Sequence, residues 1–214
     1  MILRTLPYPD YQRRVPPRGH HLLAQQTDDR MLVYQAFRPD IARYAVEHQR
    51  FGGPHYRFGR MTWIKPNFLW MMFRCGWARK PHQEAVLGIW LTKTGFLEIL
   101  DNAVYSSYQA DIYQTPAAWK VAVAGSDVRL QWDPDHDPHG AKQERRAIQL
   151  GLRGAILERF HAEMITQITD LTEFVRAQKL ALDRRGSTAL VVPDETPFDV
   201  PDAALRERLR LSPA

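Results

Sequence analysis

The sequence predicts an α+β fold: a single domain with a mixed or antiparallel sheet flanked by helices. Segments typical of strands and of helices follow one another without the regular β-α-β spacing of a doubly wound parallel sheet. Two strand-like segments late in the chain are separated only by a loop. A length of 214 residues, with 44% hydrophobic and 25% charged residues, suits one globular unit better than two.

Composition divides the chain into three parts. Residues 1–20 are rich in Pro and Arg and predict an extended basic N-terminal arm, either disordered or laid over the domain. Residues 21–178 carry the alternating apolar segments of the single α+β domain. Residues 179–214 are polar and Pro-rich, and predict a tail with one short amphipathic helix at DAALRERLRL.

The first half of the domain begins with MLVYQAF, an apolar and β-prone segment that predicts a buried strand. A helix is predicted over RPDIARYAVEHQRFGG, because Pro39 suits a first helical turn and the Gly pair a stop. RFGRMTWIK predicts a second strand. PNFLWMMFRCG then predicts an almost wholly buried helix, since apolar residues recur on both of its faces.

The second half of the domain continues the alternation. Thr115 is placed to cap a helix whose first turn contains Pro116. The predicted strands are AVLGIWLTK, VRLQW, RAIQLGL and MITQITDL, and the predicted helices are GFLEILDNA, TPAAWKVAVAGS and GAILERFHA.

An acidic segment, DPDHDPHGAKQE, is predicted to be a solvated loop after VRLQW. Its acids at positions 1, 3, 5 and 12 echo the calcium loop of an EF-hand. Pro138 stands where that loop needs Gly, and the segment follows a strand. His136 and His139 lack a second pair of ligands. We therefore predict no metal site.

The most unusual feature of the sequence is an acid-free window from His48 to Gln83. The chain has 24 acidic residues, and an even spread would place about four in a window of this length. Eight aromatic residues accompany the basic residues of the window, which are Arg50, Arg57, Arg60, Lys65, Arg74, Arg79 and Lys80. Two interpretations stay open: a solvated basic face beside a packed aromatic core, or a binding site for an anionic ligand.

The segment GGPHYRFGRMTWIK favours the binding interpretation. Arginine presents a planar fork of donors that matches phosphate, and aromatic rings offer a face on which a nucleobase can stack. Glycine lets the backbone approach a ligand closely. The candidate ligand-binding residues are Arg50, His55, Tyr56, Arg57, Arg60, Trp63 and Lys65.

Glu144 is the candidate catalytic carboxylate. A glutamate at the edge of a strand can orient a sugar hydroxyl or act as a base, and Gln131 is a second polar candidate nearby. The alternative is that both are ordinary polar residues at a strand edge.

The chain resembles the bacterial and fungal family known as domain of unknown function 4291. The resemblance spans the chain up to about residue 178 and implies no catalytic residue. It rests on VYQAFRPDIARYAVEHQRFGG, FGRMTWIKPNFLWMMFRCGW, VRLQWDPDHDP and RRAIQLGLRG.

The order of elements also resembles the ADP-ribosyltransferase type of fold, which implies a split sheet and NAD as cofactor. In those domains the nicotinamide riboside is held from the first strand, from near the second strand and from near a late strand. The resemblance places Gln35, then Tyr56 or Thr62, then Glu144 in comparable positions. Gln35 departs from the His or Arg that such proteins usually carry.

Three functions are compatible with these observations. The preferred one is a nucleotide-binding protein, with transferase activity on a nucleic acid or protein as its extension. The second is a non-catalytic RNA- or DNA-binding module, with the arm residues Arg4, Arg13, Arg14 and Arg18 extending the basic face. The third is a partner protein that docks through AALRERLRL.

The remaining expectations are general ones. A net charge of +5 favours an anionic partner. A single cysteine, Cys75, and the lack of a long apolar segment predict a cytoplasmic protein with no membrane span.

Overall fold

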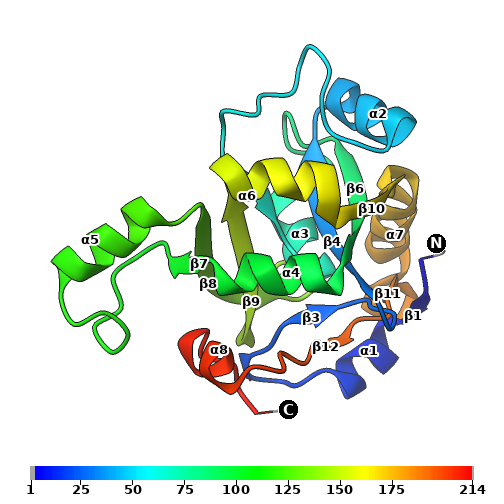
Figure 1. The fold of residues 1–214 in the computed structure, drawn as a ribbon. Coiled ribbons are helices and arrows are strands. Elements are labelled where there is room, and N and C mark those ends of the chain that lie inside the picture. The colour runs from blue at the N-terminus through cyan, green and yellow to red at the C-terminus, as the bar shows by residue number, and fades with distance from the viewer. Residues whose placement is uncertain (1–2, 214) are drawn as a thin grey trace.

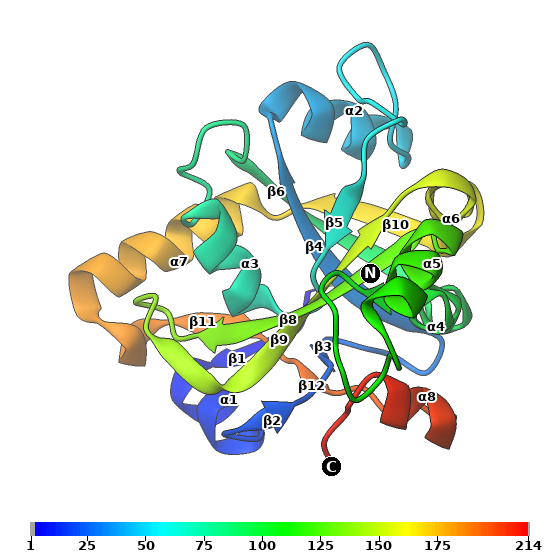
Figure 2. The ribbon, with the colours of Figure 1, turned by 90° about the vertical axis from the view of Figure 1, so that its left-hand side faces the viewer.

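The computed structural model describes residues 3–213, in which the two larger of four sheets join at one corner into a curled β layer (Figure 1). Helices cover both sides of this layer, with α3 and α7 on one side and α4 and α6 on the other (Figure 2). The predicted α+β class is confirmed. The helices are α1 (Tyr8–Arg14), α2 (Pro39–His48), α3 (Phe68–Cys75), α4 (Lys93–Asp101), α5 (Pro116–Gly125), α6 (Gly154–Arg159), α7 (Thr172–Arg185) and α8 (Ala203–Arg208).

The first sheet is antiparallel and three-stranded, in the order β10 (Ile165–Asp170), β6 (Ala85–Thr92), β4 (Arg30–Phe37). β4 and β6 are buried on both faces because each face packs against helices, whereas the edge strand β10 is partly exposed. Along β4, for example, Val33 faces the core that contains α4 and α6, while Leu32 faces the core that contains α3 and α7. The sheet therefore separates two hydrophobic cores.

The second sheet is mixed. Its backbone is the antiparallel hairpin of β8 (Val128–His136) and β9 (Lys142–Leu152). Two short parallel strands extend it, β7 (Ala103–Tyr105) beside β8 and β2 (Gly19–His20) beside β9. β5 (Thr62–Ile64) pairs with the far end of β9.

The two sheets meet where β5 ends. Tyr34 and Lys65 exchange backbone hydrogen bonds, from Tyr34 N to Lys65 O at 2.7 Å and from Lys65 N to Tyr34 O at 3.1 Å. This bridge fixes β5 between β4 and β9. The side chains that follow β5 consequently face the angle between the sheets.

Helix α3 follows this junction directly. Asn67 caps it by accepting a hydrogen bond from Trp70 N at 2.7 Å, and Gly76 ends it in the left-handed conformation. As predicted, most of the helix is buried. Its exposed residues, Phe73 and Arg74, lie in its last turn.

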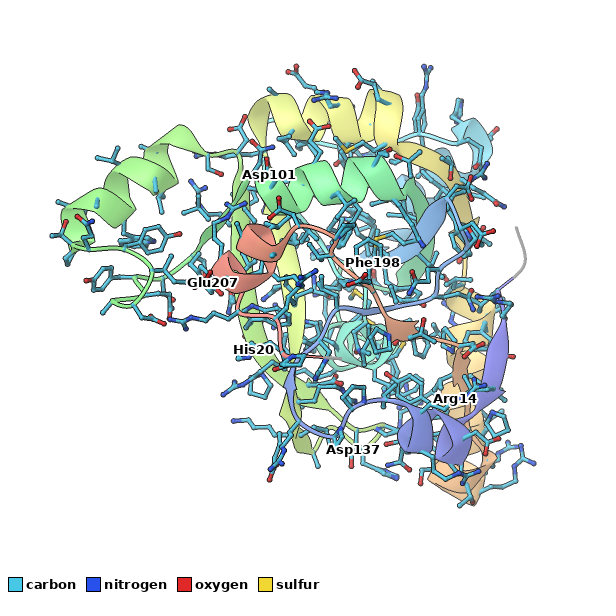
Figure 3. All side chains as sticks on the ribbon, turned by 60° about the horizontal axis from the view of Figure 1, so that its bottom comes forward. Arg14, His20, Asp101, Asp137, Phe198 and Glu207 are labelled. Atoms are coloured by element: carbon cyan, nitrogen blue, oxygen red, sulfur yellow. The ribbon has the colours of Figure 1, made fainter. Side chains whose placement is uncertain are left out.

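Both terminal segments pack against the domain, and they lie side by side (Figure 3). β1 (Thr5–Pro7) pairs with β11 (Val191–Pro193), and β3 (Leu23–Ala24) pairs with β12 (Thr196–Pro197). Tyr11, in α1, is almost fully buried. Neither α1 nor α7 was predicted from the sequence. Both helices form because the few apolar residues of these polar segments pack into the hydrophobic core that contains α3.

Two predicted boundaries were wrong. The acidic segment predicted as a loop continues β8 as far as His136, because Asp135 is buried against Arg145 of β9. Conversely, the first part of RFGRMTWIK is a turn closed by Arg60 N on Arg57 O, and only Thr62–Ile64 form the strand. Within residues 3–213, no helix is both long and apolar enough to cross a bilayer.

Candidate functional site

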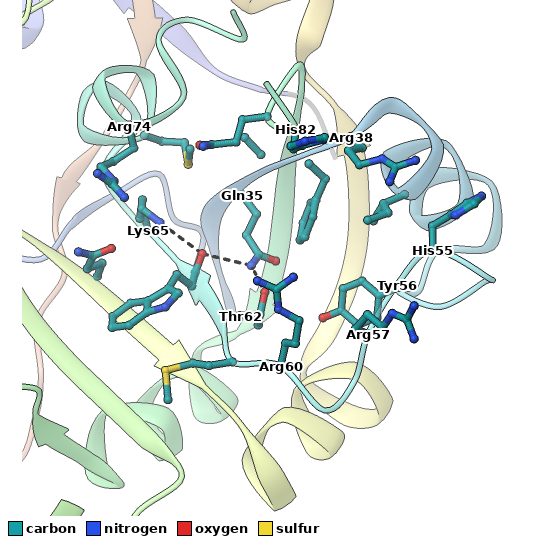
Figure 4. A pocket seen from close by; sticks show the side chains of 18 of the residues that line it. Gln35, Arg38, His55, Tyr56, Arg57, Arg60, Thr62, Lys65, Arg74 and His82 are labelled. Atoms are coloured by element: carbon teal, nitrogen blue, oxygen red, sulfur yellow. Dashed lines mark hydrogen bonds between the residues drawn. The ribbon is translucent and has the colours of Figure 1, made fainter. Parts of the chain in front are cut away.

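A cavity of about 1000 Å³ occupies the angle between the two sheets (Figure 4). β4 and β5 form one side of it, α3 another, and the β8–β9 hairpin a third, while residues 54–61 form its rim. The cavity brings together most of the residues singled out from the sequence, namely Gln35, His55, Tyr56, Arg57, Arg60, Thr62, Trp63 and Lys65. Gln131 also lines it.

Two predicted residues lie elsewhere. Arg50 is exposed after α2 and does not line the cavity. Glu144 is exposed on β9, five residues before the cavity-lining Gln149, which is roughly 16 Å along an extended strand.

The hairpin contributes a polar wall. Gln131 of β8 lies opposite Gln149 of β9 in the register. The amide of Gln131 donates to Asp133 Oδ1 at 3.0 Å, and the amide of Gln149 donates to Asp133 Oδ2 at 2.8 Å. Among residues 3–213, Asp133 supplies the cavity's single carboxylate. The sequence analysis had assigned Asp133 to a solvated loop.

Trp63 lies against the hairpin because Gly151 leaves room for it. A Cβ atom at Gly151 would lie 2.6 Å from Met61 Sδ and 3.0 Å from the Trp63 ring. The half-buried indole lines the cavity and packs over Gly151 of β9. An aromatic face of this kind is suited to stacking on a flat ligand ring.

Gln35 and Thr62 join β4 to β5 across the cavity wall. Gln35 Nε2 donates to Thr62 Oγ1 at 2.6 Å and to Trp63 O at 3.1 Å. Among residues 3–213, Gln35 Oε1 has no hydrogen-bond partner, although the residue is only 3% exposed. A buried acceptor without a donor is costly, and a ligand donor would relieve this cost.

Tyr56 is paired with a histidine that the sequence analysis did not assign to the site. Its hydroxyl lies 3.1 Å from His161 Nε2, on the π-helical turn Phe160–Met164. Burial raises the pKa of Tyr56 to about 12 and lowers the pKa of His161 to about 4. Both side chains are therefore neutral near pH 7 and add no charge to the cavity.

The charge of the cavity comes from its cations. Arg38 is held by Asp40 at 2.6 Å. The other four cations have no carboxylate within ion-pair distance in residues 3–213, and they are Arg57, Arg60, Lys65 and Arg74. Arg60 reaches toward the middle of the cavity, whereas Arg57 points outward at the rim beside Tyr56 (Figure 4).

Lys65 is the most buried of these cations, with 6% of its surface exposed. Its Nζ has one long hydrogen bond, 3.4 Å to Trp63 O. Burial and, to a smaller extent, the nearby Arg74 guanidinium lower the pKa of Lys65 to about 8, against weaker opposite effects of Cys75 and Asp133. An amine so placed is available to an incoming anion.

No cluster of three or more His, Cys, Asp or Glu side chains in residues 3–213 is close enough to hold a metal ion. The site is thus defined by guanidinium, ammonium, amide and aromatic groups, which bind by hydrogen bonding, charge and stacking.

These features define an α+β domain with a basic cavity at the junction of two sheets. The chain belongs to the family described as Domain of unknown function (DUF4291), whose model matches residues 21–198. A search of curated protein sequences finds no match. The resemblance to this family is confirmed. The likeness to ADP-ribosyltransferases stays a prediction, so function is argued from the cavity.

Proposed function

We propose that the cavity binds a nucleotide, a compact ligand that carries both phosphate and an aromatic ring. The observation that carries the proposal is the charge of the lining. Among residues 3–213, five cationic side chains line the cavity or its rim against the single carboxylate of Asp133, and four of the five have no ion pair there. Maintaining unpaired like charges close together is costly, and an anionic ligand offsets that cost.

The other walls support a ring-bearing ligand. A volume of about 1000 Å³ lies at the upper end of the range for small-molecule sites and accommodates a dinucleotide. Trp63 offers a face for stacking. The polar groups of Gln35, Gln131 and Gln149 can hydrogen-bond a base or a ribose.

The transferase extension keeps NAD among the nucleotides to be tested. It does not include Glu144, because that residue does not line the cavity. Asp133 is the carboxylate that could orient a ribose hydroxyl there, since its oxygens retain acceptor capacity beyond the two amide hydrogen bonds.

The nucleic-acid alternative has less support from the N-terminal arm. Arg4 donates to Gln26 O, Arg13 pairs with Asp10, and Arg14 pairs with Asp194. None of these arginines lines the cavity, and neither does Arg18. A compact ligand needs no such extension.

The partner-protein alternative requires a free apolar face on α8. Leu205 and Leu209 are instead buried against the core of α4 and α6. Arg208 also donates to Asp101 O at 2.7 Å. The face that would dock a partner already stabilises this chain.

Thermal denaturation with ADP, ATP, NAD, adenosine and a short RNA tests the proposal. A ligand at 100 times its Kd adds about 2.7 kcal/mol of stability. For a chain of this size that corresponds to a rise in Tm of roughly 5–10 °C. We expect this rise with at least one nucleotide and a much smaller one with adenosine.

Two variants control the test. Arg60→Gln changes a cavity cation and is expected to reduce the nucleotide-dependent rise. Arg14→Gln changes an arm cation outside the cavity and should leave it intact. Stabilisation by RNA alone, with steep loss in moderate salt, would instead favour the nucleic-acid module.

A further inference from the structure

Lys65 and Arg74 reach one side of the cavity from neighbouring elements. Lys65 follows β5 and is fixed by two backbone hydrogen bonds to Tyr34. Arg74 lies in the last turn of α3. Both line the cavity, and their side chains lie on the same side of it (Figure 4). Lys65 is buried, whereas Arg74, like Arg57 and Arg60, is exposed.

The groups that face Lys65 leave it without a counter-ion. On α3 these are Arg74, a second cation, and Cys75, a buried thiol whose pKa is raised by burial. On β8 the facing group is Asp133, whose carboxylate accepts from two glutamine amides and lies beyond ion-pair distance of Lys65 in the described part of the chain. On β4 it is Gln35, which does not ionise.

We propose that Lys65 and Arg74 form the subsite for the ligand's terminal phosphate, and that Lys65 takes up a proton as the phosphate binds. The inference rests on the proposed binding of a nucleotide and names the place of its phosphate. The two donors complement each other, because Arg74 supplies a planar fork and Lys65 a compact charge.

Proton uptake follows from the buried position of Lys65. With a pKa of about 8, about half of the Lys65 amines are neutral at pH 8 and about a tenth at pH 7. A phosphate beside the amine favours its charged form and returns the pKa toward its ordinary value. Binding at pH 8 therefore draws about half a proton from the buffer, and binding at pH 7 about a tenth.

The same linkage sets the pH dependence of affinity. Below pH 7 the amine is already charged, and Lys65 contributes no further change in affinity. As pH rises above 8, the affinity falls toward tenfold per pH unit, because the proton must be acquired on binding. The terminal phosphate has its own pKa near 6, so only about a hundredth of it is protonated at pH 8, where its contribution to the proton count is negligible.

Titration calorimetry with ADP at pH 8, in buffers of different ionisation enthalpy, counts the protons taken up. We expect about half a proton for the wild-type protein. Lys65→Arg keeps the positive charge at all accessible pH values, so it should bind ADP with no uptake. Lys65→Met should lose the uptake and bind at least tenfold more weakly.

Arg57→Gln is the matched control, since it removes a rim cation and should preserve the proton count. Equal proton counts in the wild-type protein and Lys65→Arg would overturn the inference while leaving nucleotide binding in place. Adenosine binding as tightly as ADP would remove the phosphate subsite but keep a site for the ring. Failure of ADP, ATP and NAD to bind at millimolar concentration would overturn both the inference and the proposed function.

Discussion

The β8–β9 hairpin contributes to two charged clusters that are built in opposite ways. Near its turn, Arg145 donates twice to Asp135 Oδ2, at 2.6 and 2.9 Å, and once to Pro16 O at 2.7 Å. Further along the hairpin, Asp133 and Gln149 face the cavity that also contains Lys65, a buried cation with a single long hydrogen bond. The first cluster is buried and its charges are paired. In the second, Lys65 and Gln149 are buried and Asp133 is half-buried, and Lys65 has no ion pair among residues 3–213.

This difference distinguishes charged side chains that pair within the protein from those that remain available to a ligand. Asp135 and Arg145 tie the hairpin to the N-terminal segment, and each neutralises the other. Lys65 has no ion pair of this kind within residues 3–213. Because burial disfavours its charged form, it lowers the stability of the folded state at neutral pH. A buried cation that costs stability and borders a cavity is a candidate for ligand binding, as the proposed function requires.

The largest effect is expected where the internal pair is broken. Asp135→Ala leaves the Arg145 guanidinium buried and unpaired, which should lower the free energy of unfolding by about 3–5 kcal/mol. Urea denaturation at pH 7 measures this. A loss below 1 kcal/mol would show that the pair is replaced by water or by movement of the hairpin.

Lys65→Met is expected to change stability in the other direction. The pKa of Lys65 is about 8 against an ordinary 10.5, a difference of about 2.5 units that corresponds to at most about 3 kcal/mol. The variant should be more stable than the wild type by up to that amount at pH 7.

Because folding lowers the pKa of Lys65, the stability difference between Lys65→Met and the wild type should depend on pH. A lysine whose pKa is lowered by folding destabilises the folded state below pH 8, and the penalty disappears as pH rises to about 10.5. The advantage of Lys65→Met should shrink over the same interval. A destabilised Lys65→Met protein would mean that Lys65 is structural, like Arg145.

Gly151→Ala tests the cavity wall that Trp63 forms against β9. The added methyl group meets Met61 Sδ and the Trp63 ring at 3.0 Å or less, so the indole must shift. We expect a loss of about 1–3 kcal/mol in stability, typical of overpacking, together with weaker ADP binding. Unchanged binding, measured by calorimetry, would show that Trp63 does not contact the ligand.

The smallest effect is expected at Glu144. Glu144→Gln alters an exposed side chain outside the cavity, so stability should change by less than about 0.5 kcal/mol and ADP affinity by less than twofold. Asp133→Asn, which neutralises the carboxylate inside the cavity, is the matched comparison and should alter affinity. A larger effect of Glu144→Gln than of Asp133→Asn would restore the catalytic role first predicted for Glu144.

The sequence could predict which residues gather at the cavity because they are close in the chain. His55 to Lys65 run along its rim and into β5, so one acid-free segment supplies much of the lining. The helix after it was also predictable from its apolar spacing. Arg74 was missed because that helix was interpreted as core.

What the sequence could not predict depends on pairing between distant strands. Asp133 and Asp135 look like parts of a solvated acidic loop until Gln149 and Arg145 are placed opposite them. The face on which Glu144 lies depends on the same register. Helix α7 was missed because most of its residues are polar. Only a few of them are buried against the domain, among them Val175 and Leu182.

The central claim is that the cavity at the junction of the sheets binds the phosphate and ring of a nucleotide. A crystal structure of the protein with ADP tests it most directly. The account predicts ligand density in this cavity, with the ring beside Trp63 and the terminal phosphate between Lys65 and Arg74. Density for ADP elsewhere on the surface, with these side chains untouched, would contradict it.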